Sequence, residues 1–197
     1  MDKEALNNAG LDLIFRSART YNAWQDRGIP RSVMEEVYEL AKMGPTSANC
    51  CPARFVFVSS TEAKAKLQPC LAEGNVAKTM QAPCCVIVAY DREFYEQLPE
   101  LFPSRDMRAM FAGNAALIED TARRNVALQG GYLIMAARAI GLDCGPMSGF
   151  DREAVDKAFF PDGQWRSDFL CSLGYGDAEG LYPRSPRLDF STACQVL

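Results

Sequence analysis

The segment that most restricts the fold of this chain is residues 115–140, which begins with charged side chains and becomes almost wholly apolar from Val126 onward. A helix that is apolar on all sides has to be surrounded by protein. In a chain of 197 residues, this predicts a central helix covered partly by a second copy of the chain. Gly130 and Gly131 disfavour helix, so we expect another backbone to approach closely there. Gly141 should end the helix as its C′ residue.

Shorter patterns on both sides of this segment alternate between helix and strand. The continuous apolar run at 84–90 is typical of a strand that is buried on both faces, whereas residues 73–78 form a polar segment. The expected elements are helices over 32–43 and 61–71 and strands over 54–59, 84–90 and 169–173. Because strands and helices are interspersed, we expect an α+β layered core and one domain over residues 1–197.

The chain contains no histidine, which excludes mechanisms that need a histidine base, metal ligand or pH switch. Its 21 lysines and arginines against 25 aspartates and glutamates give a net charge of −4. An acidic chain argues against a nucleic acid or an anionic membrane as partner. No window reaches the roughly 18 apolar residues of a spanning helix, and no secretory signal is visible. We therefore expect a cytoplasmic protein without a metal, acting on a small molecule.

The eight cysteines do not follow a disulfide or zinc pattern. Two pairs are adjacent in sequence, no Cys-x-x-Cys occurs, and no histidine could complete a mixed zinc site. Several lie in apolar runs, where a free cysteine behaves as a small hydrophobic residue. We expect reduced thiols, with a redox pair at Cys50 and Cys51 as the alternative.

Two basic elements lie near the ends of the chain. Arg16 and Arg19 stand three residues apart with Ser17 between them, and Arg184 and Arg187 repeat the spacing near the C-terminus. Arginine presents a rigid fork of donors that suits phosphate oxygens. Taken alone, the first element is more typical of a solvated basic face, and the second is only a weak indication of phosphate binding.

Three further elements could contact a planar ligand. The loop at 44–54 carries two prolines and short polar side chains, which can present backbone amides and hydroxyls; it could also be a plain helix stop. Asn75 and Lys78 lie one helical turn apart and could hold the polar edge of a heterocycle, or simply be exposed. The glycines of 141–151 would let the backbone approach a flat group, although a strand-to-helix turn with Asp151 as N-cap explains them as well.

In their order along nearly the whole chain, these elements resemble the nitroreductase family of flavin enzymes. The matching motifs are Arg-Ser-x-Arg-x-aromatic at 16–21, Pro-Thr-Ser-Ala-Asn at 45–49, Asn-x-x-Lys at 75–78, Gly-Leu-x-x-x-Pro-x-x-Gly-Phe-Asp at 141–151 and the C-terminal basic pair. Within the family, residues 44–50, 94–103 and 145–151 resemble the malonic semialdehyde reductases of the Rut pyrimidine-degradation pathway.

The resemblance implies a layered α/β/α nitroreductase fold and an intertwined homodimer with FMN at the subunit interface. In one subunit, the residues implied to face the phosphate, ribityl chain and pyrimidine edge are Arg16, Ser17, Arg19, Arg184, Arg187, Asn75 and Lys78. Those implied to approach the isoalloxazine from the other subunit are Pro45, Thr46, Ser47 and Asn49, and those behind the ring are Pro146, Met147, Ser148 and Gly149. The sequence departs from the family at Phe15, where many members have arginine, and at Ser148, where others have an acidic residue.

The resemblance also implies an activity: hydride transfer from NADH or NADPH through FMN to a small acceptor, which for the subgroup is 3-oxopropanoate, reduced to 3-hydroxypropanoate. No catalytic side chain is then needed, because the flavin carries the chemistry. Arg105 and Arg108 are candidates for holding the carboxylate of the acceptor. The alternatives are a broad-specificity nitro or quinone reductase, a flavin-binding protein without turnover, and a flavin-free thiol switch at Cys50 and Cys51.

Overall fold

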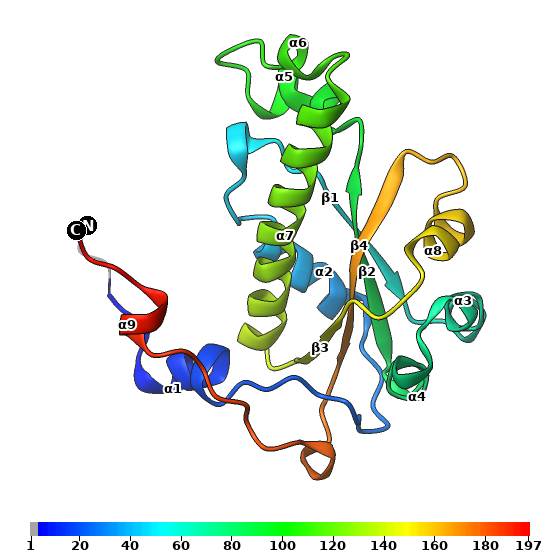
Figure 1. The fold of residues 1–197 in the computed structure, drawn as a ribbon. Coiled ribbons are helices and arrows are strands. Elements are labelled where there is room, and N and C mark those ends of the chain that lie inside the picture. The colour runs from blue at the N-terminus through cyan, green and yellow to red at the C-terminus, as the bar shows by residue number, and fades with distance from the viewer. Residues whose placement is uncertain (1–3) are drawn as a thin grey trace.

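A four-stranded antiparallel sheet forms the centre of the computed structural model, which describes residues 4–197 (Figure 1). The strands are β1 (Ala53–Val58), β2 (Cys84–Asp91), β3 (Asp143–Met147) and β4 (Trp165–Gly174), in the spatial order β1-β2-β4-β3. The two inner strands, β2 and β4, pair along almost their full lengths, with a register shift between Val88 and Ala89.

Helices cover both faces of this sheet, as Figure 1 shows. One face carries α2 (Arg31–Ala41) and the long α7 (Ala115–Ala139); the other carries α3 (Thr61–Leu67), α4 (Glu73–Gln81) and α8 (Arg152–Phe159). The shorter helices are α1 (Asn8–Leu11), α5 (Leu98–Leu101), α6 (Arg108–Phe111) and α9 (Phe190–Ala193). The expected α+β class and layered α/β/α arrangement are confirmed.

Strand β2 separates two hydrophobic cores, because successive side chains of a strand point to opposite faces. Cys84, Val86, Val88 and Tyr90 belong to the core beneath α2 and α7, and Cys85, Ile87 and Ala89 to the core beneath α3 and α8. Every residue of the strand is buried. The prediction of a strand buried on both faces is therefore confirmed.

Helix α7 has its expected extent and central position, but the expected close approach of another backbone was wrong at Gly130. A Cβ at Gly130 would lie 2.5 Å from Cζ of Phe169, so an aromatic ring packs there instead of another backbone. A Cβ at Gly131 would meet nothing within 4 Å. The helix also buries three polar residues on its inner face, Thr121, Asn125 and Gln129.

Several element boundaries differ from the expectations. Helix α2 ends at Ala41, and α3 ends at Leu67, where a 3-10 turn containing a proline (Gln68–Cys70) follows. The polar residues 73–78 form the first two turns of α4, and the expected turn at 141–151 contains β3, which pairs with β4. Gly141 has φ +86° and Asp151 caps α8, as predicted.

The two ends of the chain lie side by side (Figure 1). Arg184 Nη2 donates to the carbonyl oxygens of Arg16 (2.9 Å) and Ala18 (2.8 Å), and Arg19 donates to that of Tyr182. The C-terminal segment exposes large apolar side chains, namely Tyr182, Leu188, Phe190, Val196 and Leu197. Within residues 4–197, no helix combines the length and the apolar character needed to cross a membrane.

Candidate functional site

A cavity of about 220 Å³ lies where both chain ends meet the C-terminal end of α7, and we call it the arginine cavity. Its four arginines are Arg19, Arg138, Arg184 and Arg187, with Thr20, Asn22 and Ser185 among the remaining lining residues. No carboxylate side chain of residues 4–197 lines it. Guanidinium groups that converge without a lining carboxylate form a binding site for an anion, and their forked donors favour phosphate.

The hydrogen bonds given for Arg19, Arg184 and Arg187 go to backbone carbonyls, and the carboxylate of Asp143 lies close enough to the fourth arginine, Arg138, to feel its charge. Arg184 and Arg19 donate to backbone carbonyls of the chain ends, and Arg187 donates to the carbonyls of Ser185 (2.9 Å) and Pro186 (3.1 Å). Carbonyl oxygens are neutral acceptors, so these bonds orient the guanidinium groups and leave their charge available to a ligand.

Arg138 is the arginine that sequence reasoning missed. Its Nη1 donates to the carbonyl of Ile14 at 3.2 Å, but its Nε is buried and has no hydrogen-bond partner in the described chain. A buried donor without an acceptor is destabilising. Arg138 also lines the arginine cavity, so it adds its positive charge to the site.

Two residues of the N-terminal basic element, Arg16 and Ser17, lie outside this lining. Arg16 forms an ion pair with Asp12 at 2.7 Å and donates to the carbonyl of Asn8 at 3.0 Å. Ser17 ends the π-helical turn Asp12–Arg16, and its N–H donates to the carbonyl of Asp12. Of the two basic elements, Arg19, Arg184 and Arg187 are therefore brought together, and Arg16 is not.

Lys78 lies next to the arginine cavity. Its Nζ donates to Oδ1 of Asn22, a lining residue, at 3.2 Å. Trp24 Nε1 donates to the carbonyl oxygen of Lys78 at 3.0 Å, which fixes this turn of α4.

Burial raises the pKa of the Asp143 carboxyl, whereas a hydrogen bond from the Gly176 N–H and the positive charge of Arg138 act in the opposite direction.

Asn75 joins α4 to the glycine-containing segment after β3. Its Nδ2 donates to the carbonyl oxygen of Gly149 at 2.7 Å, and a Cβ at Gly149 would lie 2.5 Å from the same nitrogen. Only glycine permits this approach. In the same segment Met147 is buried and accepts a hydrogen bond from Thr79, whereas Ser148 is exposed and Pro146 half-buried. The structure thus brings together two sequence elements that were predicted separately.

The loop that carries Pro45, Thr46, Ser47 and Asn49 has an unusual backbone, and we call residues 45–52 the polar loop. Ala48, Asn49 and Cys51 have φ values of 49°, 49° and 39°, a conformation that costs non-glycine residues about 1–3 kcal/mol each. Local bonds hold it: Cys51 N donates to Thr46 Oγ1 at 3.1 Å, and Asn49 Nδ2 to the carbonyl of Leu101 at 2.8 Å. A backbone this strained persists only where its surroundings determine it.

Two buried side-chain amides of α7 accept hydrogen bonds from the backbone within and just after the polar loop. Asn125 Oδ1 accepts the Ser47 N–H at 2.8 Å, and Gln129 Oε1 accepts the Ala53 N–H at 2.9 Å. Both amides lie one turn apart on the inner face of α7. Sequence reasoning missed them, although polar residues four apart in an otherwise apolar helix are the signal that could have found them.

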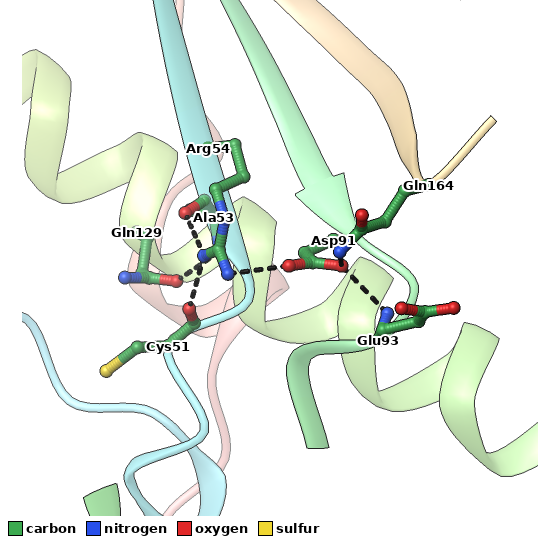
Figure 2. Close-up of polar contacts among 7 residues, drawn as sticks. All are labelled: Cys51, Ala53, Arg54, Asp91, Glu93, Gln129 and Gln164. Carbon is green, nitrogen blue, oxygen red and sulfur yellow. Dashed lines mark hydrogen bonds and ion pairs between the residues drawn. The ribbon is translucent and has the colours of Figure 1, made fainter. Parts of the chain in front are cut away.

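Arg54 closes the far end of the polar loop (Figure 2). Its Nη1 donates to the carbonyls of Cys51 (3.2 Å) and Ala53 (2.9 Å), and its Nη2 pairs with Asp91 Oδ2 at 2.7 Å. Asp91 is buried, and its second oxygen accepts bonds from the Gln164 side chain and the Glu93 N–H. This network is a structural clamp that sequence reasoning also missed.

The polar loop and the arginine cavity contact different parts of α7. Asn125 lies near the middle of the helix and Arg138 in its last turn. At a rise of about 1.5 Å per residue, the two contacts are about 20 Å apart along the helix axis.

Arg105 and Arg108 lie at the opposite end of α7 from the arginine cavity (Figure 1): Arg105 is between α5 and α6, and Arg108 is the first residue of α6. Arg108 is already paired: its Nε and Nη2 donate to the Glu96 carboxylate at 2.6 and 2.9 Å, and this contact raises the pKa of Arg108. Arg105 lines an open hollow of about 390 Å³ beside Asp106. Arg105 is therefore the better placed of the two for binding an anionic substrate.

All eight cysteines carry free thiols. Burial raises the pKa of Cys50 to about 11, with the neighbouring Cys51 adding to the effect. A reactive thiol needs the opposite shift. The burial of Cys50 therefore argues against this residue as the reactive thiol.

Comparisons with known proteins identify the family of this chain. Residues 16–175 match the family model described as "Nitroreductase family". Two relatives, each named "putative NADH dehydrogenase/NAD(P)H nitroreductase", come from Rhodopseudomonas palustris (60% identity, covering 95% of both chains) and Burkholderia lata (59%, covering 97% of this chain and 98% of the relative). The solved structure of a "putative nitroreductase in complex with FMN" from Exiguobacterium sibiricum superposes with a TM-score of 0.86 at 21% identity, covering 100% of both chains. The family resemblance is thereby confirmed, and the chain belongs to the nitroreductase family.

Proposed function

We propose that this protein is an FMN-dependent NAD(P)H oxidoreductase. The observation that carries the proposal is the arginine cavity, which is lined by four arginines and by no carboxylate of residues 4–197. A phosphate monoester matches this lining, since it brings about two negative charges and several acceptor oxygens. The names of the relatives, which mention NAD(P)H, and of the FMN-bound structural neighbour support the same assignment.

The residues around the cavity fit the remainder of the cofactor. FMN, when bound, supplies the hydride chemistry, which agrees with a chain that has no histidine. Lys78 and Asn75 would face the pyrimidine edge, where a cation stabilises developing negative charge. The Gly149 backbone and the exposed Ser148 would lie behind the ring with Pro146 and Met147.

We also propose that the working unit is a homodimer. The polar loop is about 20 Å from the arginine cavity along α7, which suits a site whose two halves come from different subunits. Leu128 and Tyr132 are exposed on α7, beside the open position at Gly131. The apolar side chains of the C-terminal segment are likewise exposed. A second copy would cover both surfaces.

For the acceptor, we propose 3-oxopropanoate, reduced to 3-hydroxypropanoate. This assignment rests on the resemblance of residues 44–50, 94–103 and 145–151 to malonic semialdehyde reductases, and Arg105 would hold the carboxylate. The names of the relatives favour a second candidate, a broad-specificity nitro or quinone reductase. A flavin-binding protein without turnover is the candidate from a different class.

An absorption spectrum of the purified protein tests the cofactor and the activity together. We expect a flavin spectrum that NADH or NADPH bleaches without oxygen and that 3-oxopropanoate restores. Failure to take up added FMN would refute the proposal, and bound FMN that neither nicotinamide bleaches would indicate a non-catalytic flavin protein. Comparing kcat/KM for 3-oxopropanoate and a nitroaromatic compound separates the two reductase candidates.

Light scattering of Gly131→Leu tests the dimer. A side chain at this position meets nothing within one chain, so we expect the variant to fold but to dissociate. Gly74→Leu is the matched control, because Gly74 also lies in a helix with open space around its Cβ position. An unchanged mass for Gly131→Leu would contradict the proposed role of this face.

A further inference from the structure

Both polar atoms of the Asn125 side-chain amide form hydrogen bonds, and the partners are Ser47 and Thr121. Its Oδ1 accepts the Ser47 N–H at 2.8 Å, and its Nδ2 donates to the Thr121 carbonyl at 2.8 Å and to Ser47 Oγ at 3.3 Å. The orientation of the amide is forced, because an N–H can only donate and a carbonyl can only accept. Asn125 is fully buried, so water does not compete for these bonds.

This arrangement determines what the Ser47 hydroxyl can do. A serine hydroxyl has one hydrogen to donate and lone pairs to accept with. Because Ser47 Oγ accepts from Asn125, its own hydrogen has to point elsewhere. No acceptor for that hydrogen lies within hydrogen-bond distance among residues 4–197, and Ser47 is exposed. The hydroxyl is therefore held as a donor that faces away from α7.

We propose that Asn125 is a positioning residue that fixes the Ser47 hydroxyl as a hydrogen-bond donor to an acceptor atom of the FMN ring system. The proposal rests on the function proposed above. Three observations combine in it: the forced amide orientation, the complete burial of Asn125, and the strained backbone at Ala48 and Asn49, which holds Ser47 at the surface. Loss of Asn125 would free the hydroxyl to rotate and would leave the Ser47 N–H without its acceptor.

A double-mutant cycle tests this role, with the FMN Kd and the flavin midpoint potential as measurements. Ser47→Ala and Asn125→Leu should each weaken FMN binding by about 3- to 10-fold, the range of one neutral hydrogen bond. If Asn125 acts through Ser47, the double variant should bind no more weakly than Asn125→Leu alone. Each variant should also have a more negative midpoint potential, because a donor to the ring stabilises its reduced, electron-rich form.

Gln129→Leu is the matched control for loss of a buried amide. Gln129 lies one turn further along the same face and bonds to Ala53 instead of Ser47. It should lose thermal stability as Asn125→Leu does but keep the wild-type midpoint potential, which separates a positioning role from a general packing role.

If Asn125→Leu does not fold, Asn125→Asp replaces it, because this variant keeps the shape and the acceptor but, when ionised, has no hydrogen for Ser47 Oγ. A wild-type Kd and potential in Ser47→Ala would overturn the inference even without an Asn125 variant, as would additive losses in the cycle. Wild-type protein that does not bind FMN would instead refute the proposed function.

Discussion

The arginine cavity and the polar loop are built on opposite principles. In the cavity, charged side chains from three separate segments converge, and their hydrogen bonds go to neutral carbonyls. In the loop, short neutral side chains project from a backbone with several left-handed residues, and the buried amides of Asn125 and Gln129 accept hydrogen bonds from that backbone and from Ala53 directly after it. The cavity therefore offers charge with modest rigidity, and the loop offers a fixed shape with no net charge.

This difference indicates that one ligand can be recognised in two ways, through charge in the cavity and through fixed hydrogen-bond geometry in the loop. Attraction between exposed charges weakens with salt, whereas hydrogen bonds set by a buried framework do not. We expect the cavity to contribute most of the affinity for FMN and the loop to tune the ring. Helix α7 contributes to both regions, through Arg138 and through the amides of its middle turns.

The largest effect should come from removing charge from the cavity. Arg138→Met combined with Arg187→Ala removes two donors to a phosphate, each worth about 1.5–3 kcal/mol. We expect the FMN Kd to rise by about 100-fold or more, and its dependence on salt to become weaker than in wild type. Fluorescence titration at two ionic strengths measures both quantities.

Two single variants sharpen this result. Arg31→Ala removes an exposed arginine of α2 that pairs with Glu35, so it controls for net charge and should bind FMN as wild type does. Arg16→Ala should have a smaller effect than the double variant, because Arg16 already pairs with Asp12. Full flavin occupancy in the double variant would contradict the phosphate assignment.

The two regions also differ in how far the sequence predicts them. Arg19, Arg184 and Arg187 could be predicted only because the two basic elements were taken together with the family resemblance, since neither pair alone distinguishes a phosphate site from a solvated face. Arg138 could not, because its role depends on the chain ends packing against the last turn of α7. The amides beneath the loop left a weaker signal, four residues apart, which the apolar pattern of the same helix obscured.

The type and position of the main helices and strands could be predicted from the residue pattern, whereas the contacts between them could not. Runs such as β2 and α7 are long and strongly apolar, so their type and position were predictable. Gly130 and Gly131 look alike in sequence, yet one lies beneath Phe169 and the other faces open space. Adjacent residues of a helix point about 100° apart. Only the rotation of α7 about its axis relative to β4 therefore decides which of the two glycines faces Phe169.

A second prediction perturbs the loop without touching the cavity. Arg54→Met removes the donors to Cys51 and Ala53 and leaves the buried Asp91 carboxylate without its cation. We expect the free energy of unfolding to fall by about 2–3 kcal/mol, below the usual range for a buried pair because the Arg54 side chain is 25% exposed. Urea unfolding measures the loss, and an unchanged midpoint would show that this clamp does not support the loop.

A third prediction tests whether the two regions are independent. In Gly130→Ala the new Cβ would lie 2.5 Å from the Phe169 ring, and overpacking of this kind costs about 1–3 kcal/mol. Because the displaced helix carries both regions, FMN binding should weaken as well. Gly131→Ala is the matched control and should be neutral or stabilise by up to about 1 kcal/mol. Equal thermal stability of the two variants would contradict the packing described for α7.

The smallest effect concerns pH, to which the two regions should respond differently. Arginines keep their charge at any pH at which the protein is folded, so the charge of the cavity is constant. In the loop region, burial raises the pKa of the Cys50 thiol from 9.0 to about 11. The folded protein therefore keeps a proton that the unfolded chain loses above pH 9, and this contribution to stability is complete below pH 9 and is lost as the pH rises towards 11. Between pH 8 and pH 10, wild type should lose about 1 kcal/mol more stability than Cys50→Ala. The other buried thiols are common to both proteins and cancel in the difference, so parallel stability curves would mean that the folded chain does not shield this thiol.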